Sequence, residues 1–173
     1  MSVLSFPQDL SAEISAVADR AYDAVAQAED LPLETIHYQE VCDKAVEFIL
    51  DNLLDNGHRV ERVVRAAQLG REYDSQGHLV PILHETRPSR RISHVYCELD
   101  AEGDETDTQV IDATWQQFLA AEKRTPELPK VLIGTHSQVL AKLQEYGITD
   151  MELLGLWATR PGSLQDDLRR LQS

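Results

Sequence analysis

The chain has 173 residues, and its 16 lysines and arginines against 30 aspartates and glutamates give a formal net charge of −14. That charge argues against nucleic acid or an anionic membrane as the main partner, because phosphate binding needs a basic face. Hydrophobic residues make up 42% of the chain, too many for a disordered acidic tail. At roughly 100–200 residues per domain, the length predicts a single domain over residues 1–173.

The two cysteines, Cys42 and Cys97, are too few for a disulfide scaffold, so we expect free thiols in a reducing compartment, with a single bridge between them as the alternative. No apolar run approaches the roughly 20 residues of a membrane-spanning helix. Residues 1–10 lack the basic start and apolar core of a secretory signal. We therefore expect a soluble protein that is cytoplasmic, or one delivered by a specialised route other than Sec. The oligomeric state stays open.

Helical signals dominate the first third of the chain. Apolar residues at helical spacing predict an N-terminal helix over residues 9–28 and a second helix over 38–56. The second ends at Asn56-Gly57, a typical stop signal. β-branched residues then predict a strand over 59–69, and a turn at 74–77 leads to a short strand over 78–84.

The middle of the chain predicts an antiparallel hairpin. Residues 92–99 alternate, with Val95, Cys97 and Leu99 on one face and His94, Tyr96 and Glu98 on the other. An acidic turn at 101–107 leads to a returning strand over 109–113. Helices together with an antiparallel pair of strands indicate the α+β class.

The C-terminal part predicts further short elements. A helical segment runs from Thr114 through Ala121, and residues 129–173 hold a C-terminal strand and helices. The strand is the apolar run 131–133. Two serines are the expected N-caps of the last two helices. They are Ser137, whose helix ends at Tyr146-Gly147, and Ser163.

Three residues have the chemistry of a cysteine nucleophile with its base. Cys42 lies in the first turn or two of a predicted helix, where the helix dipole favours a thiolate. His94 begins one predicted strand and Asp112 ends the next. If the strands pair, the Asp112 carboxylate lies beside the imidazole, fixes its tautomer and supports its charged form.

These residues stand in an ordered set of motifs that resembles a known superfamily. The set is similar to the transglutaminase-like branch of the papain-like cysteine hydrolases, and to the bacterial protein glutamine deamidases built on the same core. It covers residues 38–118. The motifs are Cys42-Asp43-Lys44-Ala45, Leu53-Leu54 with Gly57, Arg62-Val63-Val64, His94-Val95-Tyr96-Cys97-Glu98-Leu99, and Val110-Ile111-Asp112-Ala113-Thr114-Trp115-Gln116-Gln117-Phe118. This chain has Tyr96 where a tryptophan is more common, and Ala113 where a proline commonly follows the aspartate.

The resemblance implies a core in which the helix bearing Cys42 packs on a central, mainly antiparallel sheet. It implies that Cys42 is the nucleophile, His94 the base and Asp112 the orienting acid of an acyl transfer through a thioester. The expected substrate is a glutamine side-chain amide of a protein, and a basic one would suit the negative charge. Deamidation is favoured over cross-linking, because the small chain offers no evident amine-binding lobe.

The supporting residues and the cofactor are expectations of the same kind. The Cys42 backbone N–H and a second donor, Gln39 or His37, would hold the oxyanion. Tyr96 and Trp115 are further support candidates, although Trp115 alternatively belongs to the core. No metal or other cofactor is expected.

Other interpretations stay open at this point. A cysteine peptidase would use the same triad, and a non-catalytic acidic binding protein would have an inactive site. Taken alone, Cys42 is equally a small core residue, as we expect Cys97 to be. His78, His84 and Glu85 match no closed zinc site. We expect Trp157 to anchor the C-terminal segment, and no partners are expected for the remaining histidines, including His136. The basic group Arg87, Arg90 and Arg91 is expected in a solvated loop.

Overall fold

The computed structural model describes residues 8–32, 41–55, 60–69, 71–76, 78–81, 92–99, 108–159 and 164–173. The α-helices are α1 (Gln8–Glu29), α2 (Cys42–Asp55), α3 (His136–Glu145), α4 (Met151–Leu154) and α5 (Leu164–Gln172). The strands are β1 (Val60–Leu69), β2 (Arg71–Tyr73), β3 (Leu79–Pro81), β4 (Ile92–Leu99), β5 (Gln109–Asp112) and β6 (Leu132–Thr135). Short 3₁₀ turns are η2 (Trp115–Phe118), η3 (Ala121–Lys123) and η4 (Gly155–Trp157).

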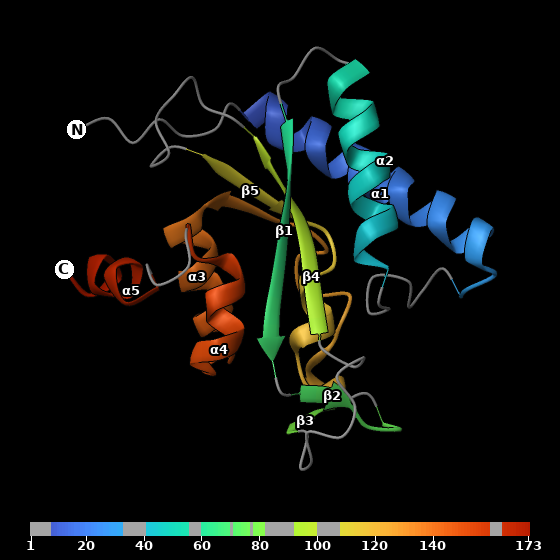
Figure 1. Ribbon diagram of the computed structural model, residues 1–173. Helices are drawn as coiled ribbons and strands as arrows, with labels where there is room; N and C mark the ends of the chain where they lie inside the picture. Colours follow the sequence, from blue (N-terminus) through green and yellow to red (C-terminus); the bar gives the residue numbers. More distant parts are fainter. Residues whose placement is uncertain are drawn as a thin grey trace.

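The centre of the molecule is a four-stranded antiparallel sheet in the order β1-β4-β5-β6 (Figure 1). Val60 of β1 lies opposite Leu99 of β4, and Cys97 of β4 lies opposite Ile111 of β5. The predicted hairpin of 92–99 with 109–113 is therefore confirmed, and so is the α+β class. A separate two-stranded sheet, β2 with β3, lies near one end of β1 (Figure 1).

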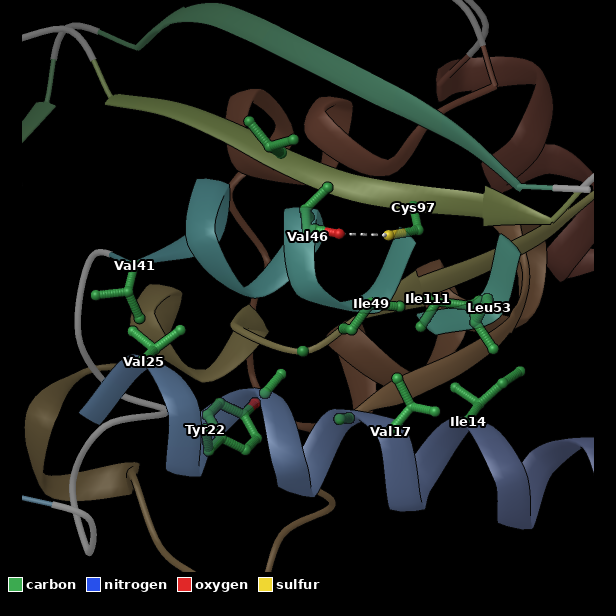
Figure 2. Close-up of a cluster of buried hydrophobic side chains, with 14 of the residues drawn as sticks. Ile14, Val17, Tyr22, Val25, Val41, Val46, Ile49, Leu53, Cys97 and Ile111 are labelled. Atoms are coloured by element: carbon green, nitrogen blue, oxygen red, sulfur yellow. Dashed lines mark hydrogen bonds between the residues drawn. The ribbon is translucent and has the colours of Figure 1, made fainter. Parts of the chain in front are cut away.

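Helices α1 and α2 cover one face of this sheet. In α1 the apolar residues recur every three or four positions, so one stripe of the helix is buried. It packs with α2 against the face of β4 and β5 that carries Val95, Cys97 and Ile111 (Figure 2). The buried part of the α1 stripe is Ile14, Val17, Ala18, Ala21, Tyr22, Val25 and Ala26.

The C-terminal elements cover the opposite face. Tyr96 of β4, Val110 of β5 and Leu132 of β6 belong to a second apolar cluster, together with residues of α3, α4 and η4. The alternation along β4 thus places His94, Tyr96 and Glu98 under the C-terminal half of the chain, as the pattern predicted.

The sheet narrows at the level of His94. The β4–β5 register pairs Cys97 with Ile111, so the ladder ends with Asp112 before it reaches the level of His94. At that level β1 and β4 remain paired, Arg65 opposite His94. The first residue of α2 can therefore approach His94 past the end of β5.

Two boundaries of predicted helices are wrong. The second helix begins at Cys42 rather than residue 38, since Val41 is not helical and its carbonyl accepts the Ala45 N–H. The segment 114–121 is not one helix but η2 followed by η3. Leu119 is extended, and the N–H groups of η2 bond three residues back, which ends it after one turn.

A third correction concerns the cap of α3. The strand β6 extends to Thr135, and Thr135 rather than Ser137 is the N-cap. Thr135 and Gln138 form a capping box, in which each side chain accepts the other residue's backbone N–H. The predicted stop is confirmed, because Gly147 follows α3 with φ 97°, a conformation that favours glycine.

The hairpin of β2 and β3 differs from the prediction in part. Residues 71–73 form an unpredicted strand, and the second strand begins at Leu79. The turn between them is confirmed at residues 74–76, where the Asp74 carboxylate accepts the backbone N–H groups of Gln76 and His78. The predictions for Asn56-Gly57, residues 82–84, residues 101–107 and Ser163 lie outside the described residues. Among the helices that the structure describes, none is both long and apolar enough to cross a membrane.

Candidate active site

His94 and Asp112 form a buried pair at the end of β5. Neither side chain is exposed to solvent, and His94 Nε2 lies 2.6 Å from Asp112 Oδ2. The two residues meet because β4 and β5 are antiparallel neighbours and both side chains lie on the face beneath the C-terminal helices. The sequence-based prediction that this histidine and this aspartate lie side by side is confirmed.

Cys42 completes the group from the first turn of α2. Burial by itself would lower the pKa of His94, but the charge and hydrogen bond of Asp112, then a hydrogen bond and charge from the Cys42 sulfur, raise it to about 9. Nε2 is engaged by Asp112, so Nδ1 is the ring nitrogen open to a further partner. The structure thus brings the three predicted residues together around one imidazole.

The raised pKa of His94 has a consequence for stability. An ordinary histidine titrates near pH 6.5, and His94 in the folded protein near pH 9. Protonation of His94 therefore favours the folded state fully below pH 6.5, and this stabilisation is lost as the pH rises through 9. The site accordingly weakens the protein in alkaline solution rather than in mild acid.

Asp112 receives two further hydrogen bonds. The Thr114 backbone N–H donates to Oδ1 at 3.0 Å, and the Trp157 indole Nε1–H donates to Oδ2 at 2.6 Å. The indole is fully buried. The sequence analysis gave Trp157 only a structural place in the C-terminal segment and did not connect it with Asp112. Because Trp157 is 45 residues away from Asp112, no local sequence pattern links the two. The only general hint is that a buried tryptophan usually needs an acceptor for its N–H.

Aromatic rings and one amide enclose the imidazole of His94. Phe118 approaches it edge-on with ring centroids 4.7 Å apart, Trp157 lies at 5.5 Å and Tyr96 at 6.0 Å. The Gln117 side-chain amide lies 3.2 Å from His94 Nδ1. These neighbours account for the complete burial of the ring.

A second histidine–carboxylate pair lies beside the first on the same face. His136 Nε2 is 2.7 Å from Glu98 Oε1, and His136 Nδ1 donates to the Trp157 backbone carbonyl at 2.6 Å. No partners were expected for His136, which is buried. Trp157 therefore touches both pairs, one through its indole N–H and the other through its carbonyl oxygen.

The remaining candidates fall in different places. Tyr96 lies beside His94, whereas Trp115 stacks on Tyr146 at 5.0 Å and donates its N–H to the Pro129 carbonyl, which makes it a core residue. Cys97 is fully buried in the core, as predicted. Several candidates lie outside the described residues, namely His37, Gln39, His84, Glu85, Arg87, Arg90 and Arg91. Within the described part of the chain, no three histidine, cysteine or acidic side chains are grouped as a metal site would need.

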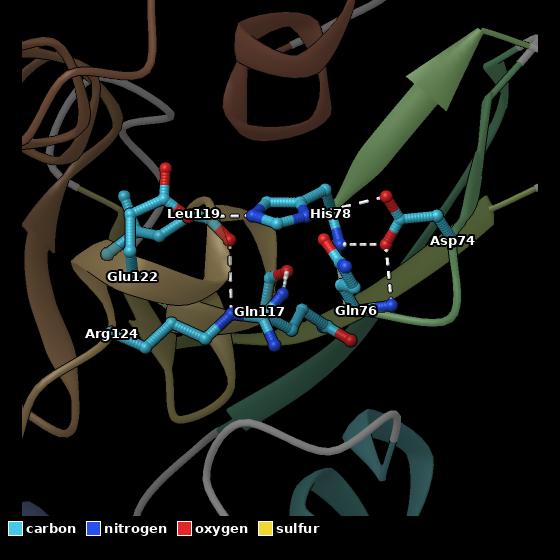
Figure 3. Close-up of polar contacts among 7 residues, drawn as sticks. All are labelled: Asp74, Gln76, His78, Gln117, Leu119, Glu122 and Arg124. Atoms are coloured by element: carbon cyan, nitrogen blue, oxygen red, sulfur yellow. Dashed lines mark hydrogen bonds and ion pairs between the residues drawn. The ribbon is translucent and has the colours of Figure 1, made fainter.

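The site differs from a surface histidine pair elsewhere in the chain. His78 lies between Asp74 and Glu122, with its Nε2 2.7 Å from Glu122 Oε2 and its Nδ1 3.4 Å from Asp74 Oδ2 (Figure 3). His78 is about one-third exposed. It joins the β2–β3 turn to η3 and was expected neither as a ligand nor as an ion-pair residue.

Comparison with known proteins gives no relative: no family model matches the sequence, and neither a curated protein nor a solved structure is detectably similar. The resemblance to the transglutaminase-like branch therefore depends on the motifs quoted above.

Proposed function

We propose that the protein is a cysteine-dependent acyl-transfer enzyme in which Cys42 is the nucleophile, His94 the general base and acid, and Asp112 the orienting carboxylate. One observation supports this above all others: the buried imidazole of His94 is hydrogen-bonded to the Asp112 carboxylate, and the Cys42 sulfur lies near enough to help raise its pKa. A nucleophile, a base within hydrogen-bond reach and a third group that orients the base are the parts that such chemistry needs.

The first half of the reaction forms a thioester. His94 Nδ1 holds the proton of Cys42, and the thiolate attacks the carbonyl carbon of a substrate amide. Asp112 keeps the other proton of the imidazolium on Nε2. The Cys42 backbone N–H is suited to bind the oxyanion, since the first N–H groups of a helix have no intrahelical acceptor. His94 then gives its Nδ1 proton to the leaving nitrogen, the C–N bond breaks, and ammonia or an amine leaves.

The second half returns the enzyme to its starting state. Water attacks the thioester while His94 Nδ1 takes one of its protons. The C–S bond breaks, a carboxylic acid is released, and the proton on His94 returns to the Cys42 sulfur. The net reaction adds one water to one amide and needs neither a metal nor a redox partner.

The substrate that we propose is a glutamine side-chain amide of a protein, because the motif order resembles that of the glutamine deamidases. A peptidase with the same triad would release an amine by cleaving the main chain. The two are distinguished by their products: ammonia and a mass increase of about one dalton for a deamidase, and two chain fragments for a peptidase.

The first test is the alkylation rate of Cys42 against pH, followed by peptide mapping in the wild type and in His94→Gln. If His94 takes the thiol proton, we expect Cys42 of the wild type to react at pH 6–7 at least about tenfold faster than in His94→Gln, because ordinary thiols are deprotonated only near pH 8.5. Equal rates in the two proteins would contradict the proposal.

Two internal controls accompany this measurement. Cys97, which is fully buried, should stay unmodified in the folded protein. His136→Gln disturbs a second buried histidine–carboxylate pair, and it should leave the pH profile of Cys42 close to that of the wild type. Loss of the profile in both histidine variants would indicate general unfolding rather than a specific base.

The alternative of a non-catalytic acidic binding protein is favoured only by the net charge of −14. Cys42→Ala separates the two functions, since it should abolish turnover but leave binding to a basic partner nearly unchanged. Binding through surface charge should also weaken steeply with added salt, because exposed charges are screened.

A further inference from the structure

The amide of Gln117 lies at the catalytic nitrogen of His94. Gln117 Nε2 is 3.2 Å from His94 Nδ1 and 3.4 Å from the Thr114 hydroxyl, and the Gln117 residue is almost wholly buried. Nε2 of the imidazole is already engaged by Asp112. Gln117 therefore lies at the ring nitrogen that Asp112 leaves open, which is the nitrogen that the proposed function assigns to proton exchange with Cys42.

His94 can accept a hydrogen bond at Nδ1 only in its neutral form, which predominates above its pKa of about 9 and offers one lone pair at that nitrogen. The Asp112 carboxylate accepts only, so it requires a proton on Nε2 and leaves Nδ1 unprotonated. The Nδ1 lone pair accepts one well-aligned hydrogen bond. An N–H donated by Gln117 consequently stabilises the neutral ring and competes with the Cys42 thiol for the same lone pair.

The backbone around Gln117 holds the amide in this place. Arg124 donates from Nη2 to the Gln117 carbonyl at 2.9 Å and from Nε to the Leu119 carbonyl at 3.0 Å, which braces η2 against the following loop (Figure 3). The Gln117 N–H in turn bonds the Thr114 carbonyl. These backbone contacts leave the three side-chain torsions of Gln117 unfixed, so the residue is anchored at its backbone and its amide can turn.

We propose that Gln117 is a positioning residue that occupies the Nδ1 side of His94 in the absence of substrate, and that the nitrogen of a substrate amide replaces it there. This inference rests on the proposed function, because the leaving nitrogen must reach Nδ1 to receive its proton. A primary amide of the protein thus fills the place that a primary amide of the substrate would take. Asp112 from β5, Cys42 from α2 and Tyr96 from β4 are titratable groups around the ring.

The contact is tested by an NMR titration of His94 in the wild type, Gln117→Met and Gln116→Met. Methionine keeps the length of the side chain but removes the donor, so protonation of Nδ1 becomes easier. We expect the acid dissociation constant of His94 to fall roughly 2- to 10-fold in Gln117→Met, which is the worth of one neutral hydrogen bond. Gln116 is equally buried and donates to the Pro129 carbonyl instead, so Gln116→Met should leave His94 unchanged.

The pH profile of Cys42 alkylation gives a second readout in the same proteins. If protonated His94 supports the thiolate, the alkaline pH at which this support is lost should move upward in Gln117→Met together with the pKa of His94. If Gln117→Met is poorly folded, Gln117→Leu removes the same donor. An unchanged or lowered pKa of His94 in a folded Gln117 variant would overturn the inference, since the amide would then present its oxygen to the ring or not act on it.

The two proposals fail in different ways. If the proposed function fails, Cys42 reacts at the same rate with and without His94, whatever the NMR titration gives. If only the role of Gln117 fails, Cys42 depends on His94 as proposed, but both Gln117 variants leave the titration of His94 and the pH profile of Cys42 alkylation unchanged or move them to lower pH.

Discussion

Two histidines of this chain are paired with carboxylates in opposite environments. His94 is fully buried against Asp112, whereas His78 lies near the surface between Asp74 and Glu122 (Figure 3). The hydrogen bond of Glu122 raises the pKa of His78 against the opposing effect of desolvation, and Asp74 adds a smaller rise. Both histidines thus favour the charged form, but only one does so away from water.

The environment decides what each pair does for the protein. A buried pair is costly to break, because the remaining charge has no water to solvate it. An exposed pair is replaced by water at little cost and is screened by salt. The comparison teaches that the same chemical pair fixes geometry in the interior and contributes little at the surface. The predictions below test that difference from the largest effect to the smallest.

Asp112→Ala should be the most damaging change. It leaves the buried His94 without a partner and the indole N–H of Trp157 without an acceptor. We expect the free energy of unfolding at pH 7 to fall by about 3–5 kcal/mol, measured by urea denaturation. Asp112→Asn keeps an acceptor oxygen and should cost less. A loss below that of Asp74→Ala at the surface would contradict the comparison.

Trp157→Phe should have an intermediate effect. It keeps the aromatic packing against Phe118 but removes a donor to a carboxylate, which is worth about 1.5–3 kcal/mol. Trp115→Phe is the matched control, because Trp115 is equally buried but donates to a neutral carbonyl, worth only about 0.5–1.5 kcal/mol. Thermal unfolding of both variants gives the ranking, and a larger loss in Trp115→Phe would refute it.

His78→Gln should have the smallest effect, and one that depends on conditions. Its pKa is raised in the folded protein, so protonated His78 stabilises the fold below pH 6.5 and ceases to do so as the pH rises through the folded value. We expect the difference between His78→Gln and wild type to appear at pH 6 in low salt and to vanish at pH 8 or in 1 M salt. Melting curves at pH 6 and at pH 8, each in low salt and in 1 M salt, measure it, and a difference that does not change with salt would rule out a surface ion pair.

Much of the fold was predictable because its signals are local. The alternation of residues 92–99 predicted the strand β4 and its two faces, and the turn after it predicted the pairing with β5. The helical spacing of apolar residues predicted α1 and its buried side. Capping was less predictable, since Thr135 and Ser137 are both good N-caps and only the length of β6 selects between them. The break between η2 and η3 depends on Leu119 turning inward, which propensity alone does not encode.

The candidate site divides along the same line. His94 and Asp112 were predictable because a hairpin brings its strands together, and Cys42 because it begins a helix. Trp157 and His136 were missed because the packing of the C-terminal helices on the sheet brings them to the site. Gln117 was missed because the turn of η2, which directs its amide at His94, has no signal of its own in the sequence. The one available signal was that a buried tryptophan N–H usually needs a hydrogen-bond acceptor, which would have pointed to a buried partner for Trp157.

The position of Trp157 in the chain also sets an order of events during synthesis. The ribosome releases Cys42, His94 and Asp112 first, and the indole that donates to Asp112 comes 45 residues after it. A contact between residues far apart in the sequence can form only after both residues have been synthesised. The nascent chain therefore contains Cys42, His94 and Asp112 before the hydrogen bond from Trp157 to Asp112 can form. The group around His94 therefore gains its full set of hydrogen bonds only after Trp157 has been synthesised.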